Sequence, residues 1–173
     1  MRINDLPTHI TLSEIPDLES RLSPSSCDHL RTWLRFLSCG RLIENEIRSR
    51  LRQEFNTTLP RYDLMAHLEK HPKGIKMSDL SRLLMVTNGN ITGITNQLVK
   101  EGLIQRTPLP QDRRSSLLKL TAKGRTQLAR ISAAHNQWVC SLFEQLPDQQ
   151  LQHMMQSLDE LKKHSLLFAE STP

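Results

Sequence analysis

The segment from Thr87 to Glu101 combines residue types that are unusual in a helix with a purely structural role. On a helical wheel, Ile91, Ile94 and Leu98 form one narrow apolar stripe, and the opposite face carries glycines, amides and hydroxyls. An exposed helical glycine costs roughly 1 kcal/mol relative to alanine. That cost has a purpose if a DNA groove must approach the backbone, and Asn and Gln amides match the donor and acceptor of an adenine edge.

The sequence therefore predicts that this helix reads bases in the major groove of duplex DNA. The alternative is an ordinary helix whose polar residues are capping residues near a loop. The face carries no arginine, so we expect it to favour A·T pairs over guanine contacts. The candidate DNA contacts are Thr87, Asn88, Asn90, Thr92, Asn96, Gln97 and Lys100.

A β-hairpin is predicted directly after this helix, with strands at residues 103–107 and 116–120. We expect Arg113 and Arg114 at its tip, where a guanidinium can enter a narrow minor groove. Asp112 is expected to orient one of these arginines through a charge-assisted hydrogen bond. The alternative is a solvated turn that contains an incidental Asp–Arg pair.

The charge distribution supports a surface for a polyanion. Residues 87–125 contain seven basic and two acidic side chains, and this window alone accounts for the formal net charge of +5. An excess that is confined to one short window favours nucleic-acid binding more than a scattered excess does.

Composition and motifs exclude several other classes of protein. Three widely spaced cysteines predict neither a disulfide framework nor a zinc site. No secretion signal or long apolar run is recognised, which predicts a cytoplasmic protein. Catalytic motifs and phosphate-binding glycine loops are missing, so we expect no enzyme, no metal and no cofactor. An RNA-binding protein is conceivable from the charge, but the chain lacks aromatic platforms on which bases could stack.

The predicted fold class is mainly α with a small β-hairpin, in which a winged helix-turn-helix lobe is joined to long dimerisation helices. The helix start at Ser25–Asp28 is expected to use a hydroxyl cap and a first-turn acid. Helices are predicted at about residues 28–55, 60–71, 77–84, 88–101 and 122–146, and from 147 onward. The predicted organisation is an arm at 1–24, a dimerisation region at 25–58 and 122–168, a DNA-binding region at 59–121, and a tail at 169–173.

The run from Asp112 to Thr121 resembles the wing signature D-x-R-x-x-x-x-x-L-T of the MarR (multiple antibiotic resistance regulator) family. Leu80–Leu84, Gly89–Thr92 and Glu101–Ile104 resemble its helix-turn-helix in order and spacing. The resemblance implies a homodimer that binds a near-palindromic operator, and repression that a small ligand relieves. It also implies a minor-groove contact from Arg114 and major-groove contacts from Asn88, Asn90, Thr92, Asn96 and Gln97. Lys76 and Gly93 depart from the usual family pattern.

The terminal helices carry more leucine and methionine than a small winged domain needs, which favours a dimer interface over packing within one monomer. A pocket for an effector could use Trp33, Tyr62 and Met65 as walls, with Arg31 or Arg35 for an anionic group. The alternative is that these are ordinary core and surface residues. Family resemblance suggests an aromatic acid or its thioester as the effector.

Two other regulators of the same fold remain open. A redox sensor could use Cys27, because a helix N-terminus lowers the pKa of a thiol, although an idle cysteine is the simpler interpretation. A metal sensor could use His67 and His71, which lie one helical turn apart, but two histidines alone are a weak metal signal.

Overall fold

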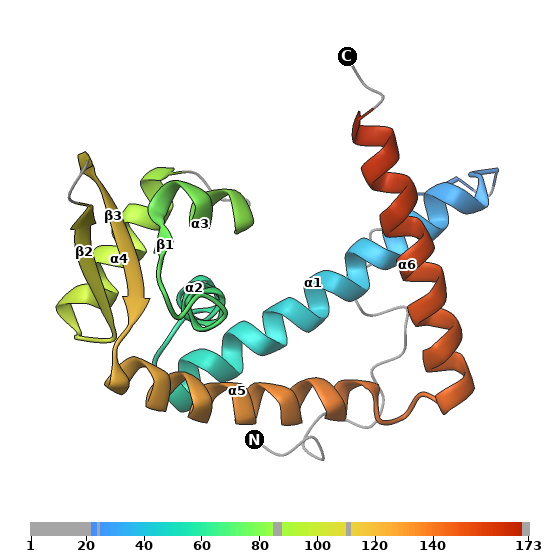
Figure 1. The fold of residues 1–173 in the computed structure, drawn as a ribbon. Coiled ribbons are helices and arrows are strands. Elements are labelled where there is room, and N and C mark those ends of the chain that lie inside the picture. Colours follow the sequence, from blue (N-terminus) through green and yellow to red (C-terminus); the bar gives the residue numbers. More distant parts are fainter. Residues whose placement is uncertain (1–21, 24, 85–87, 110–111, 171–173) are drawn as a thin grey trace. The chain divides into compact units, whose positions relative to one another are not determined.

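The computed structural model describes residues 22–23, 25–84, 88–109 and 112–170 (Figure 1). The chain forms two compact units, Met1–Asn56 and Thr57–Pro173. The predicted grouping of residues 25–58 with 122–168 as a dimerisation region stays a prediction. Most of the predicted arm at 1–24 lies outside the described residues. No helix in the described part of the chain is long and apolar enough to cross a membrane.

The first unit contains one long helix, α1 (Asp28–Phe55). Its predicted hydroxyl cap is wrong: Cys27 is the N-cap residue and makes no side-chain cap bond. The Ser25 hydroxyl lies 2.9 Å from that of Ser23, so it is engaged before the helix begins. Asp28 is in the first turn as predicted, and the helix ends where Asn56 adopts the left-handed conformation, with φ of 47°.

The second unit begins with a winged part whose elements follow the predicted order, with one addition. The elements are α2 (Leu59–Glu69), β1 (Ile75–Lys76), α3 (Met77–Leu83), α4 (Asn88–Lys100), β2 (Ile104–Leu109) and β3 (Asp112–Leu120). The three strands form an antiparallel sheet in the order β1-β3-β2. Strand β1 was not predicted, because two residues are too short to show an alternating pattern.

Both hairpin strands are longer than predicted. Strand β2 continues through Pro108, a residue that a central strand would exclude, because β2 is an edge strand and its proline needs no ladder partner on the open side. Strand β3 begins at Asp112, which pairs with Leu109. The ladder changes register between Pro108 and Leu109, so residues 113–115 bulge from β3.

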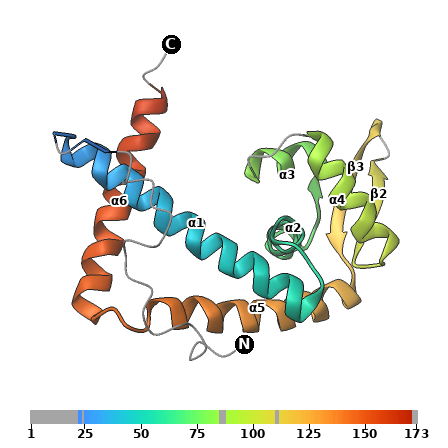
Figure 2. The ribbon, with the colours of Figure 1, turned by 180° about the vertical axis from the view of Figure 1, so that it is seen from behind.

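The core of the winged part forms where α2, α3 and α4 pack on one face of the sheet. Figure 2 shows α4 across this face, and Figure 1 shows the opposite face of the hairpin turned toward the viewer. The buried hydrophobic residues come from every element of the winged part and from the start of the next helix: Leu64, Met65, Leu68, Ile75, Leu80, Ile91, Leu98, Leu103, Ile104, Leu118, Leu120 and Leu128.

Two long helices follow the sheet, α5 (Ala122–Phe143) and α6 (Asp148–Glu170). Thr121 caps α5 as predicted: its hydroxyl accepts a hydrogen bond from the Gly124 amide at 3.0 Å. Gly124 is required by packing, because a Cβ there would lie 2.0 Å from the Leu103 carbonyl oxygen. The first turn of α5 is therefore pressed against the start of the hairpin.

Candidate nucleic-acid interface

Helix α4 has one buried and one exposed face. Ile91 and Leu98 are fully buried, as the apolar stripe predicts, and Thr95 joins them at 0% exposure. Thr95 lies on the same helical stripe, four residues after Ile91, so its position could have been predicted from the spacing. The exposed face carries four residues of the polar set: Gly93, Asn96, Gln97 and Lys100.

Other predicted contacts of α4 are placed differently. Thr92 is half-buried, and its hydroxyl lies 3.6 Å from the Met77 sulfur on α3. Packing between α3 and α4 therefore draws Thr92 toward the protein, which a helical wheel does not reveal. Asn88 and Asn90 are in the first turn of α4. Thr87 lies outside the described residues.

The connection from α4 to the hairpin is tightly defined. The Gly102 amide donates to the Val99 carbonyl and the Leu103 amide to the Leu98 carbonyl, each at 2.9 Å. This pair of bonds is a Schellman motif, and the φ of 70° at Gly102 is the left-handed conformation that such a cap requires. The predicted end of the helix at Gly102 is confirmed. The hairpin therefore leaves α4 in a fixed direction.

Side chains from α2 and α5 hold the same junction. Arg61 of α2 forms an ion pair with Glu101, which follows α4, and Lys123 Nζ donates to the Glu101 carbonyl at 2.9 Å. The hydrogen bond from Arg61 lowers the pKa of the Glu101 carboxyl below its usual value, against a smaller opposing effect of burial. Thr121 Oγ1 donates to the Gly102 carbonyl at 2.7 Å. We call these contacts the α4 latch, which comprises Arg61, Glu101, Thr121 and Lys123.

The predicted placement of Arg113 and Arg114 at the hairpin tip needs correction. Both residues are in the irregular first part of β3, and the tip itself, residues 110–111, lies outside the described residues. The ladder extends further than predicted because Leu109 still pairs with Asp112. The proposed role of Asp112 as an orienting partner stays a prediction.

One polar residue of the hairpin was missed as a candidate contact. Arg106 of β2 is exposed, and its Nε donates to the Ser116 hydroxyl of β3 at 2.7 Å. The sequence contained a signal for it, since Arg106 contributes to the basic window, but its partner Ser116 is fixed only by the strand register.

The predicted effector residues belong to both units of the chain, and the pocket that they were predicted to line stays a prediction. At the start of α1, Trp33 is half exposed and stacks on Phe36. The Arg31 side chain donates to the Ser26 carbonyl, and Arg35 is exposed. Tyr62 of α2 is half-buried against the His135 ring of α5, with ring centroids 5.0 Å apart. Met65 is 1% exposed within the core.

The structure also describes the residues that a metal sensor or a redox sensor would use. His71 Nδ1 lies 2.8 Å from the His67 carbonyl oxygen, so its ring is committed to the backbone of α2. Within the described residues, no cluster of three metal-ligating side chains occurs. Cys27, Cys39 and Cys140 are exposed free cysteines.

A three-helix core whose third helix exposes polar residues and leads directly into an antiparallel hairpin is a winged helix-turn-helix domain. Residues 57–116 match the profile of the MarR family. The crystal structure of a MarR family transcriptional regulator from Silicibacter pomeroyi is 29% identical, with a TM-score of 0.69, over 81% of this chain and 99% of that one. Residues 57–116 thus match the MarR family, and the fold of the chain is similar to that of MarR family transcriptional regulators.

Curated relatives match over shorter stretches. The HTH-type transcriptional regulator PapX of Escherichia coli is 38% identical over 40% of this chain and 42% of its own length. PecS of Dickeya dadantii, also an HTH-type transcriptional regulator, is 26% identical over 60% of this chain and 63% of its own length. The chain thus aligns with less than two thirds of either relative.

Proposed function

We propose that this protein is a dimeric DNA-binding transcriptional regulator that represses at a near-palindromic operator and releases DNA when a small ligand binds. The observation that carries the proposal is the exposed face of α4. Gly93, Asn96 and Gln97 lie on the side of a core helix that faces away from the protein, and a hairpin rich in arginine follows directly.

The chemistry of these two elements suits the two grooves of a duplex. Asn96 and Gln97 carry amides that can pair with an adenine edge, while Lys100 at the end of the helix can neutralise a phosphate. Arg114, in the adjoining strand, is proposed to reach the minor groove. We therefore expect half-sites in which A·T pairs dominate the positions under α4.

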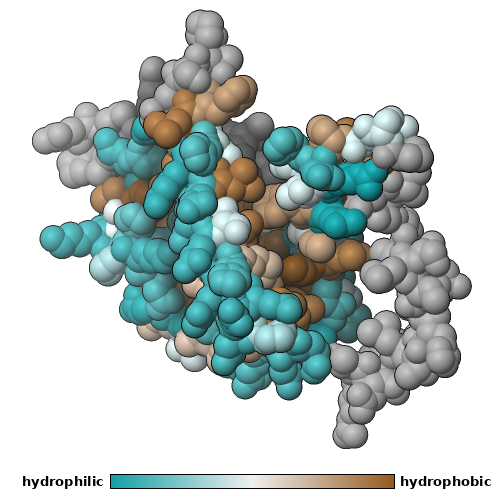
Figure 3. Space-filling view, turned by 90° about the vertical axis from the view of Figure 1, so that its right-hand side faces the viewer, coloured by the Kyte–Doolittle hydropathy of each residue, from teal (hydrophilic) through white to brown (hydrophobic). Residues whose placement is uncertain are grey.

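A dimer is supported by apolar surface on α6. Leu158, Leu161, Leu166, Leu167 and Phe168 are between 39% and 75% exposed. Figure 3 shows that the face it presents is largely hydrophilic, with hydrophobic residues between and beside the hydrophilic ones. Several large apolar side chains exposed on one helix are typical of a protein interface, and we propose that α6 pairs with a second copy of the chain. Two copies would also double the few base pairs that one lobe can read.

Repression and its relief by a ligand are proposed from family resemblance, with an aromatic acid or its thioester as the effector class. Tyr62 supports a ligand site best among the predicted residues, since it is half-buried beside a second ring. Met65 would contribute only if the core opened.

A redox-sensing regulator that uses Cys27 is the alternative function. The residue is exposed and directly precedes α1, so an oxidant can reach its sulfur. DNA binding that is unchanged after peroxide treatment would remove this alternative.

Two substitutions test the groove assignments. Arg114→Ala should weaken binding to the operator by about 1–3 kcal/mol and reduce the dependence on salt, because the variant has one cation fewer near the phosphates.

Asn96→Ala should change the base preference more than the salt dependence, because it removes an amide that reads a base. Binding isotherms at several salt concentrations, with operator and mutated duplexes, measure both. Parental behaviour of both variants would contradict the assignments.

A further inference from the structure

We propose that Arg106 is a DNA contact that binds a backbone phosphate between the major-groove helix α4 and the minor-groove wing. The proposal rests on the proposed DNA-binding function and adds a residue to it.

The strand register places Arg106 on the same face of the hairpin as α4. Arg106 pairs directly with Leu118, and Ile104 with Leu120. Directly paired residues point to the same face of a sheet. Leu118 and Leu120 are buried in the core that includes α4 residues Ile91 and Leu98, so this face is the one toward α4.

Arg106 lies just beyond the edge of that core. Ile104, two residues earlier on the same face, is 2% exposed, whereas Arg106 is exposed. Since β2 is the edge strand of the sheet, Arg106 is the first exposed side chain that β2 presents on the α4 side. A duplex with α4 in its major groove and the wing in the next minor groove would bring its backbone past this position.

The arginine is held in place by its neighbour on β3. Ser116 is 6% exposed, and its hydroxyl accepts from Arg106 Nε at 2.7 Å. Among the side chains that the structure describes, Ser116 is the hydrogen-bond partner of Arg106. An arginine has five N–H donors in a planar fork, so this bond fixes the group and leaves both terminal nitrogens able to bind a phosphate.

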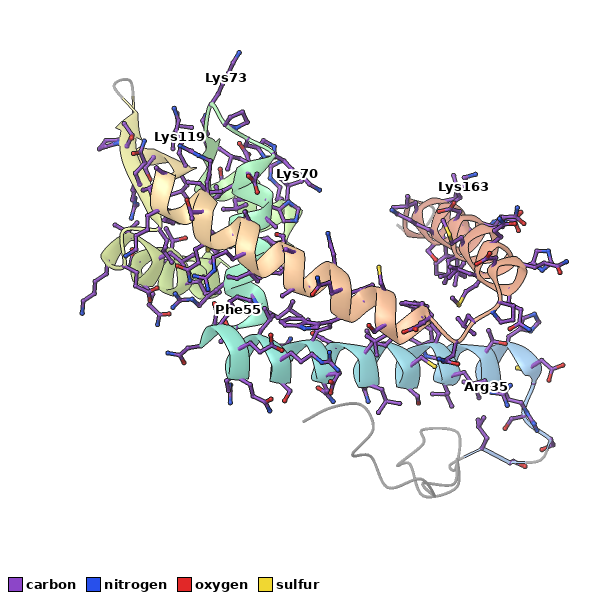
Figure 4. All side chains as sticks on the ribbon, turned by 90° about the horizontal axis from the view of Figure 1, so that it is seen from below. Arg35, Phe55, Lys70, Lys73, Lys119 and Lys163 are labelled. Carbon is purple, nitrogen blue, oxygen red and sulfur yellow. The ribbon has the colours of Figure 1, made fainter. Side chains whose placement is uncertain are left out.

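The opposite face of the hairpin provides a control of the same charge. Lys119 pairs with Gln105 and alternates with the buried Leu118 and Leu120, so it lies on the face away from α4. Its stem lies over Gly74, where an added Cβ would be 2.8 Å from Lys119 Cε. Figure 4 shows Lys119 and Lys73 on the same side of the winged part.

The test compares Arg106→Gln with Lys119→Gln, each of which removes one positive charge per subunit. Affinity for an operator duplex is measured at salt concentrations from about 50 to about 300 mM, with circular dichroism melting to verify folding. We expect Arg106→Gln to bind about tenfold more weakly and its salt slope to fall by about 0.9 for each phosphate that is no longer neutralised, which is about 1.8 for a dimer. Lys119→Gln should stay within about twofold of the parent.

Two further variants separate contact from support. Arg106→Lys keeps the charge, so the salt slope should be retained while the affinity falls because lysine has no planar fork. Ser116→Ala keeps the arginine but removes its support, so we expect affinity to fall slightly, about threefold, with an unchanged slope. If Arg106→Gln does not fold, these two variants test whether Arg106 binds a phosphate, and parental affinity of both would contradict that role.

Each outcome has a distinct meaning. A parent that binds the operator, together with an Arg106→Gln variant of unchanged affinity and slope, would overturn the role of Arg106 and leave the proposed function intact. Equal reductions in affinity for Arg106→Gln and Lys119→Gln would also overturn it, since net charge alone would explain them. A parent that does not bind duplex DNA would overturn both proposals.

Discussion

Gly93 lies on the exposed side of α4, and a Cβ built at this position would meet no atom within 4 Å. Packing within the described chain therefore does not require glycine here. Its helical conformation does not require glycine either, since its φ is not positive. The proposed approach of a DNA groove to α4 would account for the missing side chain.

Gly93→Ala should therefore change stability and binding in opposite directions. The free energy of unfolding should rise by up to about 1 kcal/mol, because alanine has the higher helix propensity. Affinity for the operator should fall, because the methyl group would meet the groove wall. Urea denaturation and binding isotherms measure the two effects.

Gly40→Ala is the matched control, because Gly40 is also helical and its Cβ would also meet nothing within 4 Å. It should stabilise the chain without weakening DNA binding. Equal binding by both variants would show that the glycine on α4 is not needed for DNA.

At the scale of residues, the sequence predicted which apolar side chains of α4 are buried, but it did not predict the contacts that single side chains make with other elements. Ile91 and Leu98 are buried as the helical stripe indicates. Thr92 was assigned to the exposed face, yet it packs against Met77 from another helix. Ser116 became a partner of Arg106 only through strand register. Long-range pairs of this kind are set by tertiary packing and are not encoded in local periodicity.

At the scale of elements, the α4 latch joins the end of α4 to α2 and α5. The Arg61 side chain is 15% exposed and Glu101 is 44% exposed, so the ion pair is partly shielded from water. Helix α4 ends just before Glu101 and the hairpin begins just after it. The latch therefore fixes the direction of the hairpin relative to α4. A small change at α2 or α5 would therefore reach both α4 and the hairpin, the two elements that are proposed to contact DNA.

The latch predicts a pH dependence of stability. The pKa of Glu101 is lowered in the folded protein, so its contribution is present above the unfolded pKa and disappears as pH falls through the folded pKa. Glu101→Gln should lower the free energy of unfolding by about 0.2–1 kcal/mol near neutral pH. In acid, below the folded pKa, the difference from the parent should be smaller.

Glu44→Gln provides the control, because the Glu44–Arg48 pair has both side chains close to half exposed and lies within one helix. Its effect near neutral pH should be smaller than that of Glu101→Gln. Urea denaturation at both pH values tests this, and a Glu101→Gln effect that does not change with pH would contradict the role of the carboxylate.

The elements were largely predictable because helix boundaries carry local chemical signals. Pro60 in the first turn of α2, Thr121 as the cap of α5 and Gly102 after α4 are confirmed. The failures concern strands: β1 is too short to show alternation, and the prolines concealed the length of β2. Strand pairing, which stabilises both, depends on residues far apart in the chain.

At the scale of the whole molecule, the proposed recognition of two half-sites requires a second copy of the chain, and the exposed apolar residues of α6 are the surface proposed to bind it. Leu161→Glu should raise the dissociation constant of the dimer at least about tenfold, or about 1.4 kcal/mol, because a carboxylate would be buried in the interface. Analytical ultracentrifugation measures this constant. Leu83→Glu is the control, since Leu83 of α3 is 48% exposed and Leu161 is 49% exposed. A dimer unaffected by Leu161→Glu would exclude this part of α6 from the interface.

The most direct test of the central claim is selection of bound sequences from a random duplex library by the full chain, with footprinting of the enriched sites. The account predicts inverted half-sites whose centres lie about 10 base pairs apart, with A·T pairs under α4 and protection of the adjoining minor grooves. Enrichment of sites without inverted symmetry, or equal affinity for duplex DNA and single-stranded RNA at matched salt, would contradict it.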